Sequence, residues 1–246
     1  MDIDKFICGD SLTIMKNMPD ECVDLVVTSP PYNLLNSTSQ SMKHKSPGKK
    51  SLWPLPKISS GYLDHGDCMP HEEYVSWQRE VLSQIMRLIK PNGAIFYNHK
   101  WRVQNGLLQD RQDIVSGFPV RQIIIWKKNG GMNFNKKFFL PSYEVIYLIC
   151  KPDFKLADEA NLFGDVWEFN AESKNSHPAP FPIPLAERII YSTDAKIVLD
   201  PFMGSGTTAI AAKKLGRNFI GIELSKEYII LSQKRLEDAM RNRRLF

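Results

Sequence analysis

Short runs of β-branched and aromatic residues alternate with amphipathic stretches along most of the 246-residue chain. Such alternation is typical of a mostly parallel sheet with helices on both faces, because parallel neighbours need a crossover between them. The pattern predicts strands at 5–8, 23–28, 94–97, 122–126, 143–150, 196–199 and 218–222. It predicts helices at 12–18, 72–90, 185–191, 207–215 and 226–240, with Pro91 to Gly93 as the stop of the second one. The sequence therefore predicts an α/β fold.

No internal repeat and no clear domain boundary interrupts this pattern, so one domain over residues 1–246 is the simplest organisation. Two segments lack periodicity. The first is a basic loop at 34–63, and the second is a polar interval at 151–180, of which 151–174 is the variable part. We expect both to be loops inserted into a single sheet.

Composition excludes several classes of protein. Hydrophobic residues make up 43% of the chain and charged residues 24%, as in ordinary globular domains. No apolar run approaches the roughly 20 residues that cross a bilayer, and the first residues lack a secretory signal, so we expect a cytoplasmic protein with no membrane contact. The four cysteines, Cys8, Cys22, Cys68 and Cys150, are spaced too widely for a zinc site or a redox pair. We expect free thiols and no metal.

The net charge is only +5, but the basic residues are clustered. Segment 34–63 contains no acidic residue and five lysines, Lys43, Lys45, Lys49, Lys50 and Lys57. Segment 121–137 also lacks acidic residues and carries several lysines. Clustered positive charge attracts a phosphate backbone, whereas the alternative for either segment alone is an ordinary solvated surface.

A glycine-rich turn follows a predicted strand at 198–216. Asp200 ends the strand, Gly204 and Gly206 form the turn, and Thr207 starts a helix. Glycines allow a ligand to approach the backbone closely, and we expect a side chain at Gly206 to occupy the place of a cofactor. The turn lacks the lysine of a phosphate loop and the third glycine of a dinucleotide fingerprint. Glu223, at the end of the next strand, is placed to accept hydrogen bonds from a ribose; the alternative is a purely structural tight turn.

A second motif follows the strand at 23–28, which runs directly into Ser29, Pro30, Pro31 and Tyr32. Two prolines end a strand and fix an extended backbone. The turn then offers a hydroxyl, a carbonyl oxygen and a flat aromatic face. Taken alone, it is equally consistent with a strand that ends at prolines beside a core tyrosine.

Together, TSPPYN (28–33) and DPFMGSGTT (200–208) resemble the amino-methyltransferases that modify DNA with S-adenosylmethionine as cofactor. The order of the motifs, with the catalytic tetrapeptide before the cofactor glycines, resembles the permuted β subgroup. A third segment, NSHPAPFPIPLAERII (175–190), matches the stretch that precedes the glycines in this family. The resemblance implies a Rossmann-like methyltransferase sheet of about seven strands in circularly permuted order, beginning at what is usually the third strand.

The resemblance also implies roles for individual residues. The cofactor would be surrounded by Asp200, Phe202, Gly204, Ser205, Gly206 and Thr207. Glu223 would hold its ribose and Asp10 would lie near its adenine amine, while His177 and Phe181 would line its methionine end. His177 alone is equally consistent with a loop histidine that caps nearby backbone groups.

The catalytic residues implied are Ser29, Pro30, Pro31 and Tyr32. The target base would be flipped out of double-stranded DNA and stacked on Tyr32, with Ser29 Oγ and the Pro30 carbonyl as acceptors for its amine hydrogens. Ser at the first position favours the N4 amine of cytosine over the N6 amine of adenine. Alternatives are an N6-adenine enzyme, a DNA-binding module without catalysis, and an enzyme acting on RNA or on a glutamine side chain. The sequence leaves open a cognate restriction endonuclease and a homodimer as partners.

Overall fold

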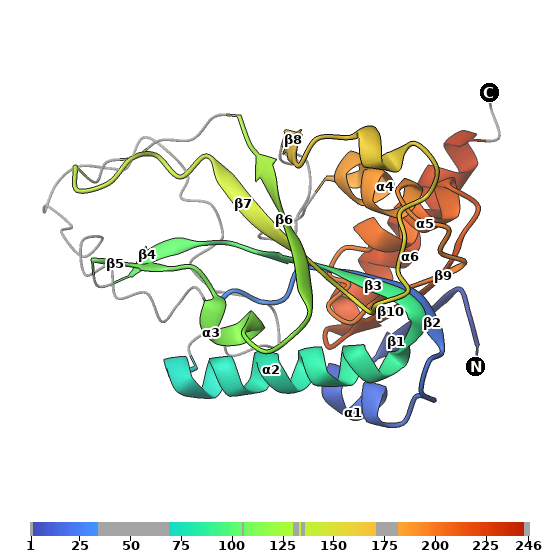
Figure 1. Ribbon diagram of the computed structural model, residues 1–246. Coiled ribbons are helices and arrows are strands. Elements are labelled where there is room, and N and C mark those ends of the chain that lie inside the picture. Colours follow the sequence, from blue (N-terminus) through green and yellow to red (C-terminus); the bar gives the residue numbers. More distant parts are fainter. Residues whose placement is uncertain are drawn as a thin grey trace, which may run out of the picture.

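The computed structural model describes residues 2–33, 69–104, 106–129, 133, 136–170 and 182–243. Its main feature is one eight-stranded sheet in the order β1-β10-β9-β2-β3-β7-β6-β8 (Figure 1). The strands are β1 (Lys5–Cys8), β2 (Val23–Thr28), β3 (Ile89–His99), β6 (Val120–Lys127), β7 (Tyr143–Cys150), β8 (Val166–Glu168), β9 (Ile197–Asp200) and β10 (Asn218–Glu223). Neighbours are parallel except for β7, which is antiparallel to both β3 and β6.

Helices cover both faces of the sheet, as the alternation predicted (Figure 1). They are α1 (Ser11–Lys16), α2 (His71–Leu88), α3 (Gln112–Val115), α4 (Ile183–Tyr191), α5 (Thr207–Lys214) and α6 (Lys226–Arg243). Successive strand residues point to opposite faces, so Val26 packs with α1, α2 and α3, whereas Leu25 and Val27 pack with α4, α5 and α6. The strands are therefore apolar on both faces, which explains their nearly continuous hydrophobic runs.

The strand order confirms the predicted α/β class and its permutation. The last two strands of the chain, β9 and β10, lie between its first two strands, β1 and β2. The connection from β9 to β10 runs through α5 on one face, and the connection from β2 to β3 runs through α2 on the other. The crossovers thus diverge between β9 and β2, which is the point where open α/β sheets usually bind ligands at the carboxyl ends of the strands.

Three details differ from the sequence prediction. The polar interval at 151–180 was expected to be loop, but it contains a short 3₁₀ helix, η4 (Ala160–Leu162), and the additional edge strand β8. Pro91 to Gly93 do not stop α2; they lie inside β3, where the pairing with β2 shifts register. The hairpin of β4 (Arg102–Gln104) and β5 (Leu107–Gln109) and the short α3 were not predicted, because three- and four-residue elements have too little periodicity.

Within the described ranges, no helix is long and apolar enough to cross a membrane, and no group of three or more histidine, cysteine or acidic side chains is placed to hold a metal ion. Cys8, Cys22 and Cys150 are free thiols. The basic loop at 34–63 and residues 171–174 of the variable polar segment lie outside the described residues.

Candidate cofactor and catalytic site

Both sequence motifs leave the sheet side by side at the point where the crossovers diverge. Leu25 and Val26 of β2 pair with Val198 and Leu199 of β9. The two strands are parallel, so their carboxyl ends lie at the same edge. The turn that starts at Ser29 and the turn that follows Asp200 are therefore neighbours, although they are far apart in sequence.

Asp200 joins the two turns. Its Oδ1 accepts hydrogen bonds from Thr28 Oγ1 at 3.0 Å and from the Phe202 amide at 3.1 Å, and its Oδ2 accepts one from Thr208 Oγ1 at 2.7 Å. The residue is 2% exposed, and this burial raises the pKa of its carboxyl group to about 6, despite the hydrogen bonds that lower it. Asp200 lies between the two turns, and its carboxylate accepts hydrogen bonds from the end of β2, the cofactor turn and the first turn of α5.

The glycine turn packs against the last helix. Gly204 and Gly206 have φ values of 54° and 82°, in the left-handed region that glycine adopts without strain. A Cβ atom at Gly206 would lie 2.8 Å from Cβ of Ser232 on α6. The expectation that a side chain at Gly206 would fill the cofactor's place is therefore wrong, because Ser232 of α6 already occupies the space into which this side chain would point.

Two acidic side chains lie next to this turn. Glu223 accepts two backbone hydrogen bonds through its side chain, from the Gly204 amide to Oε2 at 2.8 Å and from the Ser225 amide to Oε1 at 2.9 Å. Its backbone carbonyl accepts a hydrogen bond from the Gly9 amide at 2.9 Å. Asp10 comes directly after Gly9 in the chain and caps α1. Its Oδ1 accepts hydrogen bonds from both the amide and the hydroxyl of Thr13. A carboxylate has about four lone-pair positions, so each of these side chains can accept several hydrogen bonds at once.

The structure thus brings together most of the residues predicted to bind a cofactor. Phe202 packs edge-on against Trp77 of α2, with ring centroids 5.6 Å apart. Ser205 and Thr207 are buried, and Ser205 accepts hydrogen bonds from Arg235 on both its carbonyl and its hydroxyl. His177 and Phe181 lie outside the described residues.

The predicted catalytic turn is folded against a polar cluster. Tyr32 is only 3% exposed, and its hydroxyl lies 2.6 Å from Ser29 Oγ. Its ring packs on the ring of His99 at 4.9 Å. The Pro31 carbonyl accepts a hydrogen bond from Tyr74, whereas among the described residues no hydrogen bond to the carbonyl oxygen of Pro30 is present. The turn therefore keeps the two acceptors proposed for an amine, Ser29 Oγ and the Pro30 oxygen.

Sequence analysis missed the side chains behind this turn. Glu144, near the start of β7, and Asn98, near the end of β3, both bond the hydroxyl of Tyr32, and Lys128 pairs with Glu144 at 2.6 Å. A signal was present, because Glu144 is the only charged residue in the apolar run YEVIYLIC. A charged residue inside a buried strand needs a partner, and that partner is commonly part of a functional site.

His99 belongs to the same region but remains neutral. It is completely buried, and its Nε2 lies 2.7 Å from the hydroxyl of Tyr74. Burial, helped by the positive charge of Arg111, holds the pKa of His99 well below its usual value. The imidazole thus supports the ring of Tyr32 as an uncharged surface.

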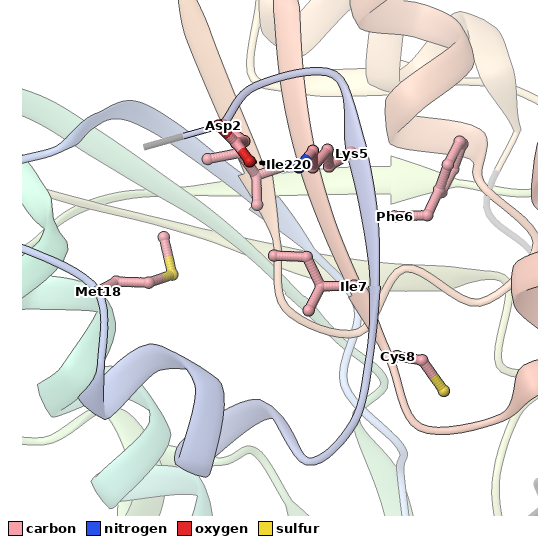
Figure 2. A pocket seen from close by; sticks show the side chains of 7 residues that line it. All are labelled: Asp2, Lys5, Phe6, Ile7, Cys8, Met18 and Ile220. Atoms are coloured by element: carbon pink, nitrogen blue, oxygen red, sulfur yellow. Dashed lines mark hydrogen bonds and ion pairs between the residues drawn. The ribbon is translucent and has the colours of Figure 1, made fainter.

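A separate hollow of about 470 Å³ lies along the edge strand β1 (Figure 2). Its lining residues are Asp2, Lys5, Phe6, Ile7, Cys8, Met18 and Ile220. Asp2 and Lys5 form an ion pair within it. This hollow does not include any residue of the two motifs, so it is distinct from the candidate site.

Comparisons with known proteins agree with this geometry. Residues 23–234 match the sequence profile of the DNA methylase family. The chain is 32% identical to the type II methyltransferase M.BglII of Bacillus subtilis, over 92% of this chain and 67% of that protein. It is 31% identical to the type II methyltransferase M2.DpnII of Streptococcus pneumoniae, over 93% of this chain and 88% of that one.

Among solved structures, TTHA0409 of Thermus thermophilus in complex with S-adenosyl-L-methionine superposes with a TM-score of 0.69. It is 26% identical, over 96% of this chain and 93% of that chain. The matched profile spans both motifs and the strands that carry them, and the fold has the permuted order that the motifs imply. The chain therefore belongs to the N6/N4 amino-methyltransferase family of DNA methylases.

Proposed function

We propose that this protein transfers a methyl group from S-adenosyl-L-methionine to the exocyclic N4 amine of cytosine in duplex DNA. The observation that carries the proposal is the position of Ser29. Its hydroxyl lies at the carboxyl end of β2, beside the cofactor turn, and its oxygen contacts the hydroxyl of Tyr32 and the side-chain amide of Asn98. An acceptor at this place is what an exocyclic amine requires.

The residues around the glycine turn fit the cofactor. When bound, S-adenosyl-L-methionine supplies an electrophilic methyl group on sulfur. Glu223 would accept hydrogen bonds from the ribose hydroxyls, since it lies beside the glycine turn and a carboxylate can accept about four hydrogen bonds. Asp10 would accept from the adenine amine through Oδ2, since both of its hydrogen bonds to Thr13 use Oδ1.

The catalytic turn would make the amine a better nucleophile. The lone pair of an exocyclic amine is delocalised into the ring, and attack requires a pyramidal nitrogen that becomes partly positive. Ser29 Oγ and the Pro30 carbonyl would accept its two N–H groups and stabilise this charge as it develops. The flipped base would stack on the face of Tyr32 opposite His99, and the side chains that cover this 3% exposed ring would move when the base enters.

The choice of cytosine rests on Ser29, the first residue of the catalytic turn. A neutral hydroxyl is a weaker acceptor than a carboxylate and does not by itself exclude adenine. A pocket shaped for a pyrimidine would reject a purine by contact. Adenine N6 is the alternative substrate within the same family.

Double-stranded DNA is the expected macromolecular partner, and the lysine-rich segments supply charge for its backbone. The type II names of M.BglII and M2.DpnII support a place in a restriction–modification system, with a cognate endonuclease as second component.

Nucleoside analysis tests the proposal. DNA incubated with the purified protein and S-adenosyl-L-methionine is digested to nucleosides, which are identified by mass spectrometry. We expect N4-methyldeoxycytidine, and we expect its loss in Ser29→Ala but not in Ser116→Ala, an exposed serine after α3. N6-methyldeoxyadenosine alone would contradict the choice of base, and the absence of both products would contradict the activity.

A further inference from the structure

We propose that Glu144 is a positioning residue that fixes the direction of the hydrogen bonds around Ser29, so that Ser29 Oγ must present a lone pair to the target amine. Glu144 does not touch the base in this proposal; it acts through the hydroxyl of Tyr32. The inference rests on the proposed function, because it concerns how the same turn receives an exocyclic amine.

The contacts of Glu144 show that its carboxylate acts only as a hydrogen-bond acceptor. Its side chain is 9% exposed. Oε1 accepts Lys128 Nζ at 2.6 Å, and Oε2 accepts Tyr32 OH at 3.0 Å and Asn98 Nδ2 at 2.9 Å. An ionised carboxylate can only accept hydrogen bonds, and its pairing with Lys128 offsets the cost of burying the charge. Tyr32 and Asn98 are therefore the donors in these contacts.

The direction of the remaining contact follows from counting hydrogens. Tyr32 has a single hydroxyl hydrogen, and it is donated to Glu144. The 2.6 Å contact between Tyr32 OH and Ser29 Oγ must then use the hydrogen of Ser29. Asn98 reinforces this order, because its amide nitrogen can only donate: its two hydrogens are shared among Glu144 Oε2, the Tyr32 oxygen at 2.7 Å and, in the longest of the three contacts, Ser29 Oγ at 3.3 Å.

The chemical consequence concerns the amine. With its own hydrogen directed at Tyr32, Ser29 can only accept from the base, which favours the nitrogen lone pair that attacks the methyl group. If the chain of hydrogen bonds were reversed, Tyr32 would donate to Ser29, and the Ser29 hydrogen would be free to bond the amine nitrogen itself. That bond would occupy the attacking lone pair and slow the reaction.

Glu144→Gln tests this directly. Glutamine has the same shape, but its amide can donate to Tyr32 and so permits the reversed order. We expect the single-turnover rate of methyl transfer to fall at least about 10-fold, which corresponds to about 1.4 kcal/mol. Cofactor and DNA dissociation constants should change less than twofold. The matched control is Glu168→Gln on β8, which removes an ion pair with Lys127 at 2.9 Å but has no link to Ser29; its rate should stay within twofold of the wild type.

A second variant separates positioning from general structure. Tyr32→Phe removes only the hydroxyl through which Glu144 acts, and we expect a loss similar to that of Glu144→Gln. The double variant should be no slower than the slower single one, because both changes break the same chain. Additive losses, or a Glu144→Gln protein as fast as Glu168→Gln, would overturn the inference while leaving the proposed function intact. Wild-type protein that methylates no DNA base would overturn both.

Discussion

At the scale of single residues, the site depends on groups that hold turns in place. Asp200 is the clearest case, since one buried carboxylate bonds the end of β2, the cofactor turn and the first turn of α5. Its position in the motif suggested a cofactor ligand, whereas its contacts make it the link between the cofactor turn and the catalytic turn. Such a buried acid makes stability depend on pH.

Replacing Asp200 with asparagine should remove this dependence. The pKa of Asp200 is raised from 3.8 to about 6 in the folded protein, so the folded state binds the proton more tightly than the unfolded state. Its contribution to stability is full below pH 3.8 and is lost as the pH rises through 6. From pH 7.5 to pH 5.0 the wild type should gain about 1.4 kcal/mol relative to Asp200→Asn in the free energy of unfolding. Urea denaturation of both proteins at the two pH values measures this, and identical pH dependence would contradict the assignment.

Two features should oppose any substitution of Gly206: the contact with α6 and the left-handed backbone conformation. Gly206→Ala places a Cβ against Ser232 at a φ of 82°, so we expect a loss of about 3 kcal/mol from the combined overpacking and strain. Gly216→Ala is the matched control, because its φ of 70° carries similar strain with no atom within 4 Å; it should lose about 1 to 2 kcal/mol. Equal losses in denaturant unfolding would mean that the contact with α6 does not matter.

At the scale of elements, the edge of the sheet shows how tertiary contacts create a strand from a polar segment. β8 has only three residues, but Trp167 is 5% exposed and pairs in register with Trp126 of β6. Arg188 of α4 lies over three aromatic rings at 4.9 to 5.7 Å from their centroids, those of Phe163, Trp167 and Phe169. One cation thus connects α4 to the segment on both sides of β8.

Removing this cation should loosen β8. Arg188→Ala loses the contacts with the rings and the packing of the alkyl chain, so we expect the free energy of unfolding to fall by about 1 to 2 kcal/mol. Arg241→Ala, an exposed arginine near the end of α6, should change it by less than about 0.5 kcal/mol. Denaturant unfolding compares the two, and a loss of equal size would show that the ring contacts contribute nothing.

At the scale of the whole molecule, basic charge is distributed unevenly. One group of four lysines lies away from the candidate site, at the amino end of a strand or the carboxyl end of a helix. These are Lys16, Lys196, Lys213 and Lys214. The lysines of segment 34–63 follow the catalytic turn directly in sequence. If DNA binds at the carboxyl edge of the sheet, only the second group should contribute to its affinity.

Salt dependence distinguishes the two groups. Replacing Lys43, Lys45, Lys49 and Lys50 with glutamine should weaken DNA binding and reduce the slope of log affinity against log salt by about 3 to 4, because each phosphate contact contributes about 0.9. The same replacement at Lys16, Lys196, Lys213 and Lys214 should leave the slope nearly unchanged. Fluorescence anisotropy over a range of salt concentrations measures both, and equal slopes for the two quadruple variants would contradict a DNA surface at the carboxyl edge.

Local patterns in the sequence were sufficient for the fold class. Strand runs such as 143–150 and helices such as 207–215 depend on hydrophobic periodicity within a few residues, and the structure confirms both within one residue. The permuted strand order was predicted from a resemblance, because the order of the two motifs resembles that of the permuted β subgroup of the family. Short elements such as β8 could not be predicted, because their stability comes from neighbouring strands rather than from their own residues.

The side chains that complete the candidate site were decided only by the tertiary structure. Ser29 and Tyr32 are recognisable in the sequence, but Glu144 is 112 residues away from Tyr32 and meets it because β7 returns antiparallel to β3. Likewise, Gly206 faces α6 rather than a ligand because of how that helix packs on the turn. The sequence alone determines the local backbone and the chemical groups available, whereas register and packing between distant segments determine which of these groups are within hydrogen-bonding distance.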